Sequence, residues 1–366
     1  MSGVGTWLER RLLSVFWAVR RRLFADWSSC AATLAICYLA WKLIPALIDW
    51  AVLRAVWSPQ HAVLCRDTDS GACWAFVAGT YRFLLFGTFP YEEHWRPATV
   101  IAILLALYAL SARRSLPAGR LTFFWLVGAI AIGALMWGGI FGLSDVENER
   151  WGGLTLTLLL ATVGIGCAFP ISIALALGRR SAMPVVRWAA IAYIEMIRGV
   201  PLISVLFMAS VMLPIFMPAG FSIDNLLRAQ LAMILFAAAY LAEVVRGGLQ
   251  AIPHEQEEAA LALGLRYWQR TRHVILPQAL RTAVPALVNT FIGFFKDTSL
   301  VVIIGLFDFL MTIKISLTDP KWTGFGMEAY LLAALGYFLF CYPMSRYSGK
   351  LERSPASERR SDRARQ

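Results

Sequence analysis

The chain has 366 residues, of which 58% are hydrophobic and only 16% are charged, whereas a soluble domain typically has about 25% charged residues. Several apolar runs approach the roughly 20 residues that a helix needs to cross a bilayer. These runs are continuous rather than alternating, which excludes a membrane β-barrel, so the composition predicts an all-α protein that crosses a lipid bilayer several times. The formal net charge of +11 comes from Lys and Arg between the apolar runs. This distribution is typical of cytoplasmic loops and argues against nucleic acid as a partner.

The first part of the chain is expected to hold an amphipathic segment and three accessory spans. Residues 1–30 mix Trp, Leu and Phe with Arg, a pattern typical of a helix that lies in the cytoplasmic membrane interface. Residues 31–151 follow, with predicted spans at 31–52, 97–112 and 121–141.

A polar loop at 54–96 separates the first two spans and is expected to lie outside the cytoplasm. It contains Cys65 and Cys73. A disulfide can form between them in an oxidising compartment, and two free thiols are an equally weighted alternative.

The second part, residues 152–345, contains five more apolar stretches, at 153–177, 199–216, 231–245, 282–312 and 329–342. Polar residues at 296–299 interrupt the fourth of these, and each half is shorter than the roughly 20 residues of a full crossing. We therefore interpret it as one crossing plus a broken or re-entrant piece. Residues 346–366 are basic and Ser-rich, and a disordered tail is expected there.

The distribution of charge predicts the orientation. Arg residues gather in the segments 113–120, 178–187 and 246–281 and in the tail, whereas acidic residues outnumber Lys and Arg in the other loops taken together, at 54–96, 142–152, 217–229 and 313–328. Basic loops remain in the cytoplasm, so the chain is predicted to cross the membrane about eight times with both termini in the cytoplasm.

The long basic loop has an internal pattern of its own. Glu, Ala and Leu between Glu255 and Leu263 favour a helix, and Gly264 can end that helix in a left-handed conformation. A second short helix is predicted from Tyr267 to Val274, stopped by Pro277. The loop is therefore expected to form a helix–turn–helix at the membrane surface.

This hairpin is expected to present Ala259, Ala260 and Leu263 as an apolar knob to a cytosolic partner. The letters from Glu258 to Pro277 read E-A-A, three residues, G, nine residues, V-I-L-P. They resemble the coupling-loop signature of bacterial ABC importer permeases, E-A-A-x3-G-x9-I-x-L-P, with Val274 in place of the Ile.

Other segments resemble a subgroup of these permeases. The stretches 194–202, 240–248 and 295–300 are similar to polar-amino-acid permeases, and the three extra N-terminal spans resemble the longer permeases of general L-amino-acid importers. The resemblance implies a five-helix type I importer core at 152–345, with its coupling loop at 251–278. The expected coupling residues are Glu258, Ala259, Ala260, Leu263, Gly264, Leu276 and Pro277.

The resemblance also implies the partners. They are a sister permease subunit, two ATP-binding-cassette ATPase subunits and a periplasmic amino-acid-binding protein, assembled in the bacterial inner membrane. The chain contains no G-x-x-x-x-G-K-[ST] phosphate-binding loop. ATP and Mg²⁺ are therefore expected on the ATPase, and this chain is expected to bind no cofactor and to catalyse no reaction.

Ionisable groups at membrane depth are further candidates, because their burial in a bilayer is costly. Lys296, Asp297, Thr298 and Ser299 could line the translocation pathway and meet the carboxylate and amino groups of a substrate. Alternatively, Lys296 and Asp297 pair with each other, or with the partner permease, and hold a helix break.

Two further pairs of charged residues lie near the inner ends of predicted spans. Glu195 and Arg198, like Glu243 and Arg246, are three residues apart and so would be neighbours on a helix. We interpret both as local structural ion pairs.

Two other functions compete with the importer hypothesis. A secondary transporter would need coupling-ion groups near the bilayer midplane and usually an internal repeat, and no repeat is evident. A membrane enzyme would need clustered ligands or a nucleophile with its base. The four His residues are scattered through polar segments, and no metal site is predicted.

Overall fold

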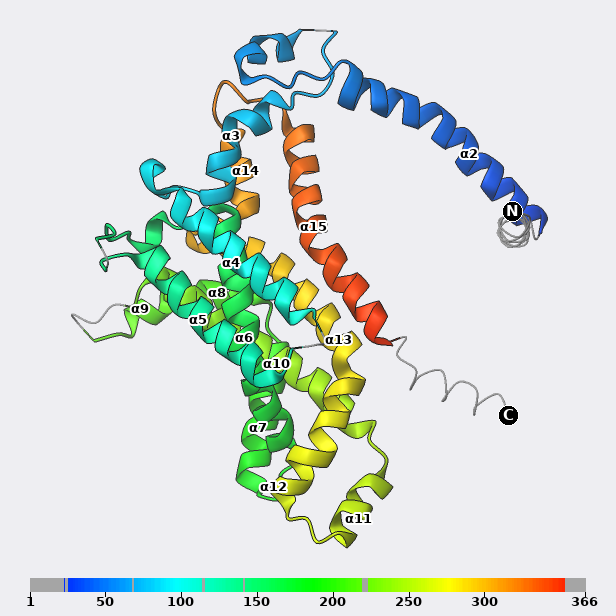
Figure 1. Cartoon of the computed structure of the whole chain (residues 1–366), viewed down its shortest axis with the longest axis vertical. Helices are drawn as coiled ribbons and strands as arrows, with labels where there is room; N and C mark the ends of the chain where they lie inside the picture. The colour runs from blue at the N-terminus through cyan, green and yellow to red at the C-terminus, as the bar shows by residue number, and fades with distance from the viewer. Residues whose placement is uncertain are drawn as a thin grey trace, which may run out of the picture. The chain divides into compact units, whose positions relative to one another are not determined.

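A computed structural model of the chain describes residues 23, 26–67, 69–113, 116–140, 142–218 and 223–352. These residues form helices joined by short connections, and no β-strand is present among them (Figure 1). Most of the predicted amphipathic segment at 1–30 and most of the predicted tail at 346–366 lie outside the described residues.

The number of spans agrees with the sequence. Within the described ranges, seven helical stretches are long and apolar enough to cross a membrane, and a bent pair of helices raises this number to eight. The seven are Trp27–Leu53, Tyr91–Ser111, Ala118–Trp137, Gly153–Arg179, Asn225–Gln250, Tyr267–Ile304 and Gly326–Leu351. The protein is therefore an all-α, multi-pass membrane protein.

The chain divides into two compact units, one that ends at Gly79 and one that begins at Thr80. In the first, helix α2 (Trp27–Ile48) continues into a π-helical turn, η1 (Asp49–Leu53), and none of its residues is buried. The following loop folds back on the end of this helix, where Trp74 donates its indole N–H to the carbonyl oxygen of Ala51 at 2.8 Å.

The loop at 54–96 is less polar than predicted. It contains the short helix η2 (Pro59–Arg66) and an apolar helix, α3 (Ala75–Phe86). A disulfide joins Cys65 to Cys73, with their Cα atoms 5.5 Å apart, so the structure contains the bridge that the sequence left open.

The second unit begins with two of the accessory spans, α4 (Trp95–Ser111) and α5 (Ala118–Trp137), which pack against each other. Arg96, whose side chain is fully buried, joins the beginning of α4 to the end of α5. Arg96 donates hydrogen bonds to the carbonyl oxygens of Leu135, at 2.6 Å, and Ser144, at 3.0 Å, and it pairs with Glu93. Carbonyl and carboxylate oxygens accept from its Nε and Nη1 groups, which offsets part of the cost of burying the charge.

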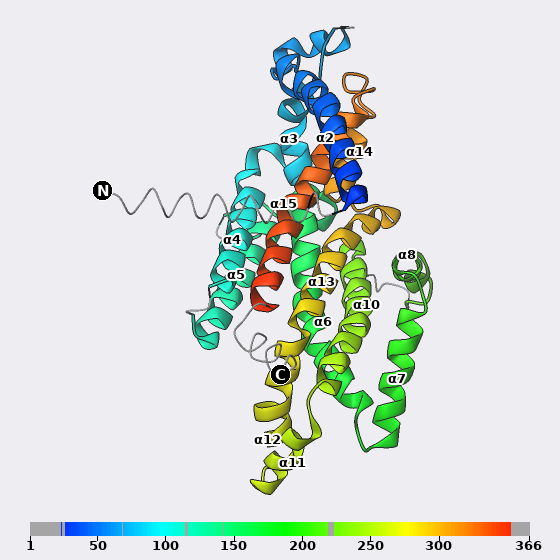
Figure 2. The same ribbon diagram turned by 90° about the vertical axis from the view of Figure 1, so that its right-hand side faces the viewer.

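The core is built on α6 (Gly153–Arg179), α10 (Asn225–Gln250) and α13 (Leu276–Asp297). Figure 2 shows these helices side by side, with α7 (Pro184–Arg198) next to α10. Small residues allow the close approach: a Cβ added to Gly248 would lie 2.5 Å from the carbonyl oxygen of Ala279. The last helix, α15 (Gly326–Glu352), packs against α13.

Two membrane segments are broken. α7 meets α8 (Leu202–Phe207) at an angle of 101°, and α8 continues through a π-helical turn, η5 (Met208–Met212), into α9 (Leu213–Ile215). α13 ends at Asp297 and gives way to the 3₁₀ segment η7 (Thr298–Ile304) and the short helix α14 (Phe309–Ser316). The second break agrees with the predicted crossing followed by a broken piece.

Candidate functional site

The predicted helix–turn–helix forms at one end of the second unit (Figure 1). Helix α11 (His254–Ala262) is followed by Gly264, which has a φ of +74°. A residue with a Cβ is strained in this left-handed conformation, which explains the glycine. The second helix, α12 (Tyr267–Arg270), is capped by Gln269, whose side-chain oxygen accepts a hydrogen bond from the Arg266 N–H at 3.0 Å.

The prediction that Pro277 stops the second helix is wrong. After α12 the chain passes through a π-helical turn, η6 (Thr271–Ile275), directly into α13. The wider turn shifts the hydrogen-bond register, so that Leu276 and Pro277 fall in the first turn of α13. A missing backbone N–H costs little at that position. The hairpin is thus continuous with a membrane span.

The apolar surface of the hairpin differs from the predicted knob. Ala259 is exposed, but Ala260 is buried with 2% of its surface accessible. The large exposed apolar side chains are Leu261, Leu263, Tyr267 and Trp268, of which Leu263 is 80% and Trp268 is 70% exposed. We call these four residues the hairpin knob. The sequence interpretation missed the aromatic pair, although two aromatic residues in a basic, water-facing loop are a signal of a binding surface.

Polar contacts hold the hairpin to itself and to the helix bundle. Glu257 pairs with Arg270 of α12 at 3.1 Å and with Arg180, at the end of α6, at 3.9 Å. Gln278 of α13 donates its amide N–H to the side-chain oxygen of Gln256 at 3.3 Å. Glu258 is exposed. Its neighbour Glu257 therefore provides the ionic link within the hairpin.

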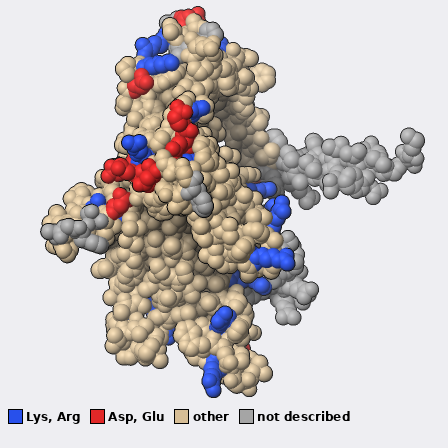
Figure 3. Space-filling model, turned by 60° about the vertical axis from the view of Figure 1, so that its left-hand side comes forward, with Lys and Arg blue, Asp and Glu red and all other residues tan. Residues whose placement is uncertain are grey.

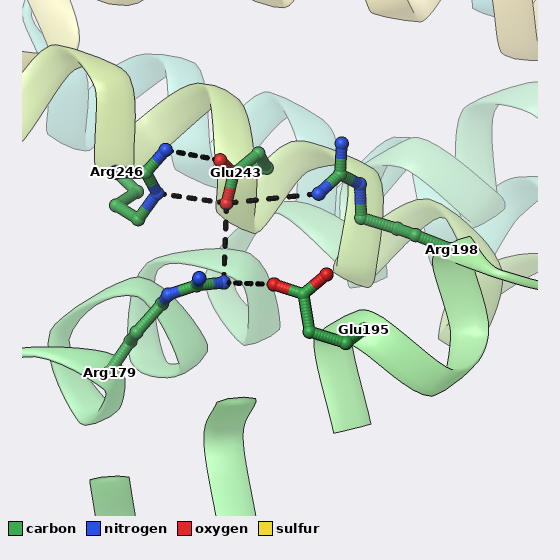
Figure 4. Close-up of polar contacts among 5 residues, drawn as sticks. All are labelled: Arg179, Glu195, Arg198, Glu243 and Arg246. Atoms are coloured by element: carbon green, nitrogen blue, oxygen red, sulfur yellow. Dashed lines mark hydrogen bonds and ion pairs between the residues drawn. The ribbon is translucent and has the colours of Figure 1, made fainter. Parts of the chain in front are cut away.

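Five charged residues form a network at the same end of the bundle (Figure 4). Glu243 of α10 is surrounded by three arginines: it accepts from Arg246 Nε at 2.9 Å, and its carboxylate is 3.5 Å from Arg179 and 4.0 Å from Arg198. Arg179 also binds Glu195 at 2.9 Å. The network therefore connects α6, α7 and α10.

The network corrects one of the two predicted local pairs. Glu243 and Arg246 pair as predicted, but Glu195 binds Arg179 of α6 and Arg198 binds Glu243 of α10. Spacing along α7 alone suggested that Glu195 and Arg198 bind each other. Packing against two other helices gives each of them a partner across the bundle instead.

Residues 168–355, just over half of the chain, match the family described as binding-protein-dependent transport system inner membrane component. The chain belongs to this family. The helix hairpin, the five-residue network and the central helices α10 and α13 all lie within the matched range.

Three permeases are similar in sequence to this chain, two of them over most of its length. An inner membrane amino-acid ABC transporter permease of Escherichia coli (strain K12), YhdY, is 49% identical over 92% of this chain and 91% of its own length. The glutamate/glutamine/aspartate/asparagine transport system permease BztC of Rhodobacter capsulatus is 35% identical, over 92% of each chain. The glutamate/aspartate import permease GltK of Escherichia coli O6:H1 is 36% identical over only 56% of this chain but 92% of its own length.

The four polar residues that interrupt the long apolar stretch of this inner membrane component lie where α13 meets η7. Lys296 is exposed and Asp297 is half-buried, and the structure, which describes both, forms no ion pair between them. Thr298 is fully buried and donates its hydroxyl to the carbonyl oxygen of Phe295 at 2.8 Å. Ser299 donates to the carbonyl oxygen of Lys296 at 2.9 Å. Thr298 therefore supports the helix break and does not line an open surface in this structure.

Proposed function

We propose that this chain is the transmembrane permease subunit of an ATP-driven, binding-protein-dependent importer of amino acids. It assembles with a sister permease, two ATPase subunits that bind ATP and Mg²⁺, and a periplasmic binding protein. The names of the relatives that match most of the chain support amino acids as the substrate class.

The hairpin knob carries the proposal. Four large apolar side chains stand exposed on a short helical hairpin, and an apolar surface of this kind needs a protein partner. Figure 3 shows Lys and Arg side chains toward the lower end of the displayed face. Helix α11 carries Glu255, Glu257 and Glu258, but the segments 178–187 and 246–281 at this end contain more Arg than acidic residues. Basic ends of membrane bundles face the cytoplasm, so the partner that fits is the cytosolic ATPase, and both chain termini are cytoplasmic.

The helical connection from the hairpin into α13 supports a role in transmitting movement. From Tyr267 onward α12, η6 and α13 follow one another without a break up to Asp297. A helix transmits displacement along its axis, because each turn is hydrogen-bonded to the next. Movement of the ATPase against α11 is therefore passed to α13 without a flexible linker, and from there to Lys296, Asp297 and Ser299, the candidates for the translocation pathway that are not fully buried.

The first test separates the importer from a secondary transporter. The chain is co-expressed with candidate sister permease and ATPase subunits, purified, and reconstituted with a candidate binding protein. We expect one complex and amino-acid uptake that stops when the ATPase is inactivated. Uptake that is driven by an ion gradient without any ATPase contradicts the proposal.

The Gly264→Asp variant tests the hairpin itself. We expect normal expression but at least tenfold less uptake, because Asp places a negative charge between the hairpin helices at the proposed ATPase contact. Gly264→Asn is the matched control, since Asn has nearly the same shape and both residues tolerate a left-handed φ. Met183→Asp, at an exposed apolar residue of the same end outside the hairpin, should retain uptake. Normal uptake by Gly264→Asp contradicts the coupling role.

A further inference from the structure

A cavity lies between the last turns of α6 and α10 and the first turn of α11. It has a volume of about 500 Å³, and we call it the arginine cavity after its lining residues Arg179, Arg180, Arg246, His254, Glu257 and Ile275. The volume lies in the range of small-molecule sites. It equals roughly one turn of a helix about 10 Å in diameter, so it suits a small group or a single side chain rather than a folded segment.

The cavity has an excess of positive charge. Three guanidinium groups line it, against the one carboxylate of Glu257. The helix dipoles oppose an anion, because α6 and α10 both end at the cavity with negative partial charge and only α11 begins there with positive partial charge. The side chains therefore decide which sign of ligand the cavity attracts.

The three arginines differ in how fully they are used. Arg179 and Arg246 hold Glu195 and Glu243 at distances near 2.9 Å. The contacts of Arg180 are longer: a hydrogen bond to the carbonyl oxygen of Leu249 at 3.5 Å and an ion pair with Glu257 at 3.9 Å. A guanidinium has five N–H donors, so Arg180 retains donors for another acceptor.

We infer that the arginine cavity binds a phosphate group, carried either by free inorganic phosphate or by the headgroup of an anionic lipid. Arginine forks bind phosphate oxygens in pairs. A phosphate carries up to two negative charges and a carboxylate only one, so phosphate suits a cavity where the free donors of Arg180 bind its oxygens while Arg179 and Arg246 add positive charge. Both sources are present at the inner ends of membrane helices, where the cytosol and the lipid headgroups meet.

Bound phosphate competes with Glu257 for Arg180. The phosphate then bridges the ends of α6 and α10 beneath the hairpin. Glu257 loses its ion pair with Arg180 and keeps the one with Arg270 of α12. The strength of the link between the hairpin and the bundle then depends on the occupancy of the cavity. This effect on coupling rests on the proposed function, whereas the binding itself does not.

The binding test uses the full-length chain alone, in uncharged detergent and low-salt chloride buffer, titrated calorimetrically with inorganic phosphate. Arg180→Gln should weaken binding about tenfold, because one charge-assisted contact is lost. Glu257→Gln should tighten it roughly threefold, because the competing carboxylate is gone. Arg187→Gln, at an exposed arginine of the same end outside the cavity, should leave it unchanged.

A second arm tests the lipid source by native mass spectrometry, comparing retention of phosphatidylglycerol and phosphatidylcholine by the same variants. Saturable phosphate binding with the expected order of variants supports the site with free phosphate as its ligand. Preferential retention of phosphatidylglycerol that Arg180→Gln abolishes supports it with a lipid headgroup.

Two outcomes overturn the inference. In one, neither the affinity for phosphate nor the retention of phosphatidylglycerol changes in Arg180→Gln or Glu257→Gln. In the other, Arg180→Gln changes neither of these quantities but reduces the co-purification of the ATPase when the complex of the first test is purified with this variant, in which case the cavity receives an acidic side chain of that partner. A gain of affinity in Glu257→Gln cannot arise from misfolding, so the test holds even if Arg180→Gln is unstable. Neither arm measures uptake, so failure here is distinct from failure of the proposed function.

Discussion

Two of the membrane spans, α2 and α10, are nearly equal in length and opposite in environment. The span that contains α2 has 27 residues, and none of its most apolar window is buried; the span of α10 has 26 residues, and 56% of its window is buried. α10 nevertheless carries Glu243 and Arg246, which have partners in the network, whereas α2 has no buried residue. Apolar character thus identifies a span, but it does not show whether the span faces lipid or protein.

The comparison extends to the family. α10 lies inside the range that matches the family, and α2 lies outside it. The permease GltK is similar over 92% of its own length while covering only 56% of this chain. About half of this chain therefore corresponds to nearly the whole of that relative, and we call the part around α2, which lies outside the family match, the N-terminal addition.

The largest expected effect breaks the packing of α10. In Gly248→Leu, the new Cβ would lie 2.5 Å from the carbonyl oxygen of Ala279 and 2.9 Å from the side chain of Ala283. We expect α10 and α13 to be forced apart, with a loss of at least about 3 kcal/mol and little folded protein. Yield of monodisperse protein and its thermal unfolding midpoint measure this.

The adjacent glycine is the matched control. A Cβ added to Gly247 meets nothing within 4 Å, and alanine is the better helix former by roughly 0.5–1 kcal/mol. Gly247→Ala should therefore be neutral or slightly stabilising. If Gly248→Leu is as stable as Gly247→Ala, α10 and α13 do not approach each other as closely at Gly248 as the structure shows.

An intermediate effect is expected in the charge network. Glu243→Gln removes the carboxylate that three arginines share, while Glu195 remains to bind Arg179. Glu243 is only 23% exposed, so we expect a loss of about 1–2 kcal/mol, between the values for exposed and buried pairs. Thermal unfolding at low and high salt measures this loss of stability. The difference between the unchanged protein and Glu243→Gln should shrink at high salt.

The Asp49→Asn variant provides the comparison from the first unit. Asp49 and Arg54 form a single pair whose side chains are 40% and 50% exposed. Such pairs contribute roughly 0–1 kcal/mol, so this variant should change stability less than Glu243→Gln. If Asp49→Asn and Glu243→Gln lose the same stability, the network contributes no more to stability than one exposed ion pair.

The same contrast explains which features could be predicted from sequence. The spans follow from apolar runs, and the turn at Gly264 follows from a glycine between two helix-forming segments, since both depend on local chemistry. The pairing of Glu195 with Arg179, and the burial of Ala260 beside the exposed Leu261, depend on which helices pack together. Local spacing does not contain that information, because one helix offers several faces to a neighbour.

The smallest expected effect is on α2 itself. Leu39 is 54% exposed, and in a membrane its neighbours are lipid chains, which replace the lost contacts after truncation. Leu39→Ala should therefore change the stability of the assembled complex by less than about 0.5 kcal/mol. The same change in α10, Leu241→Ala, removes a side chain that is fully buried and should cost about 2 kcal/mol or more. If Leu39→Ala destabilises the complex as much as Leu241→Ala does, α2 packs against a partner subunit, and the N-terminal addition is an assembly element rather than a lipid-facing span.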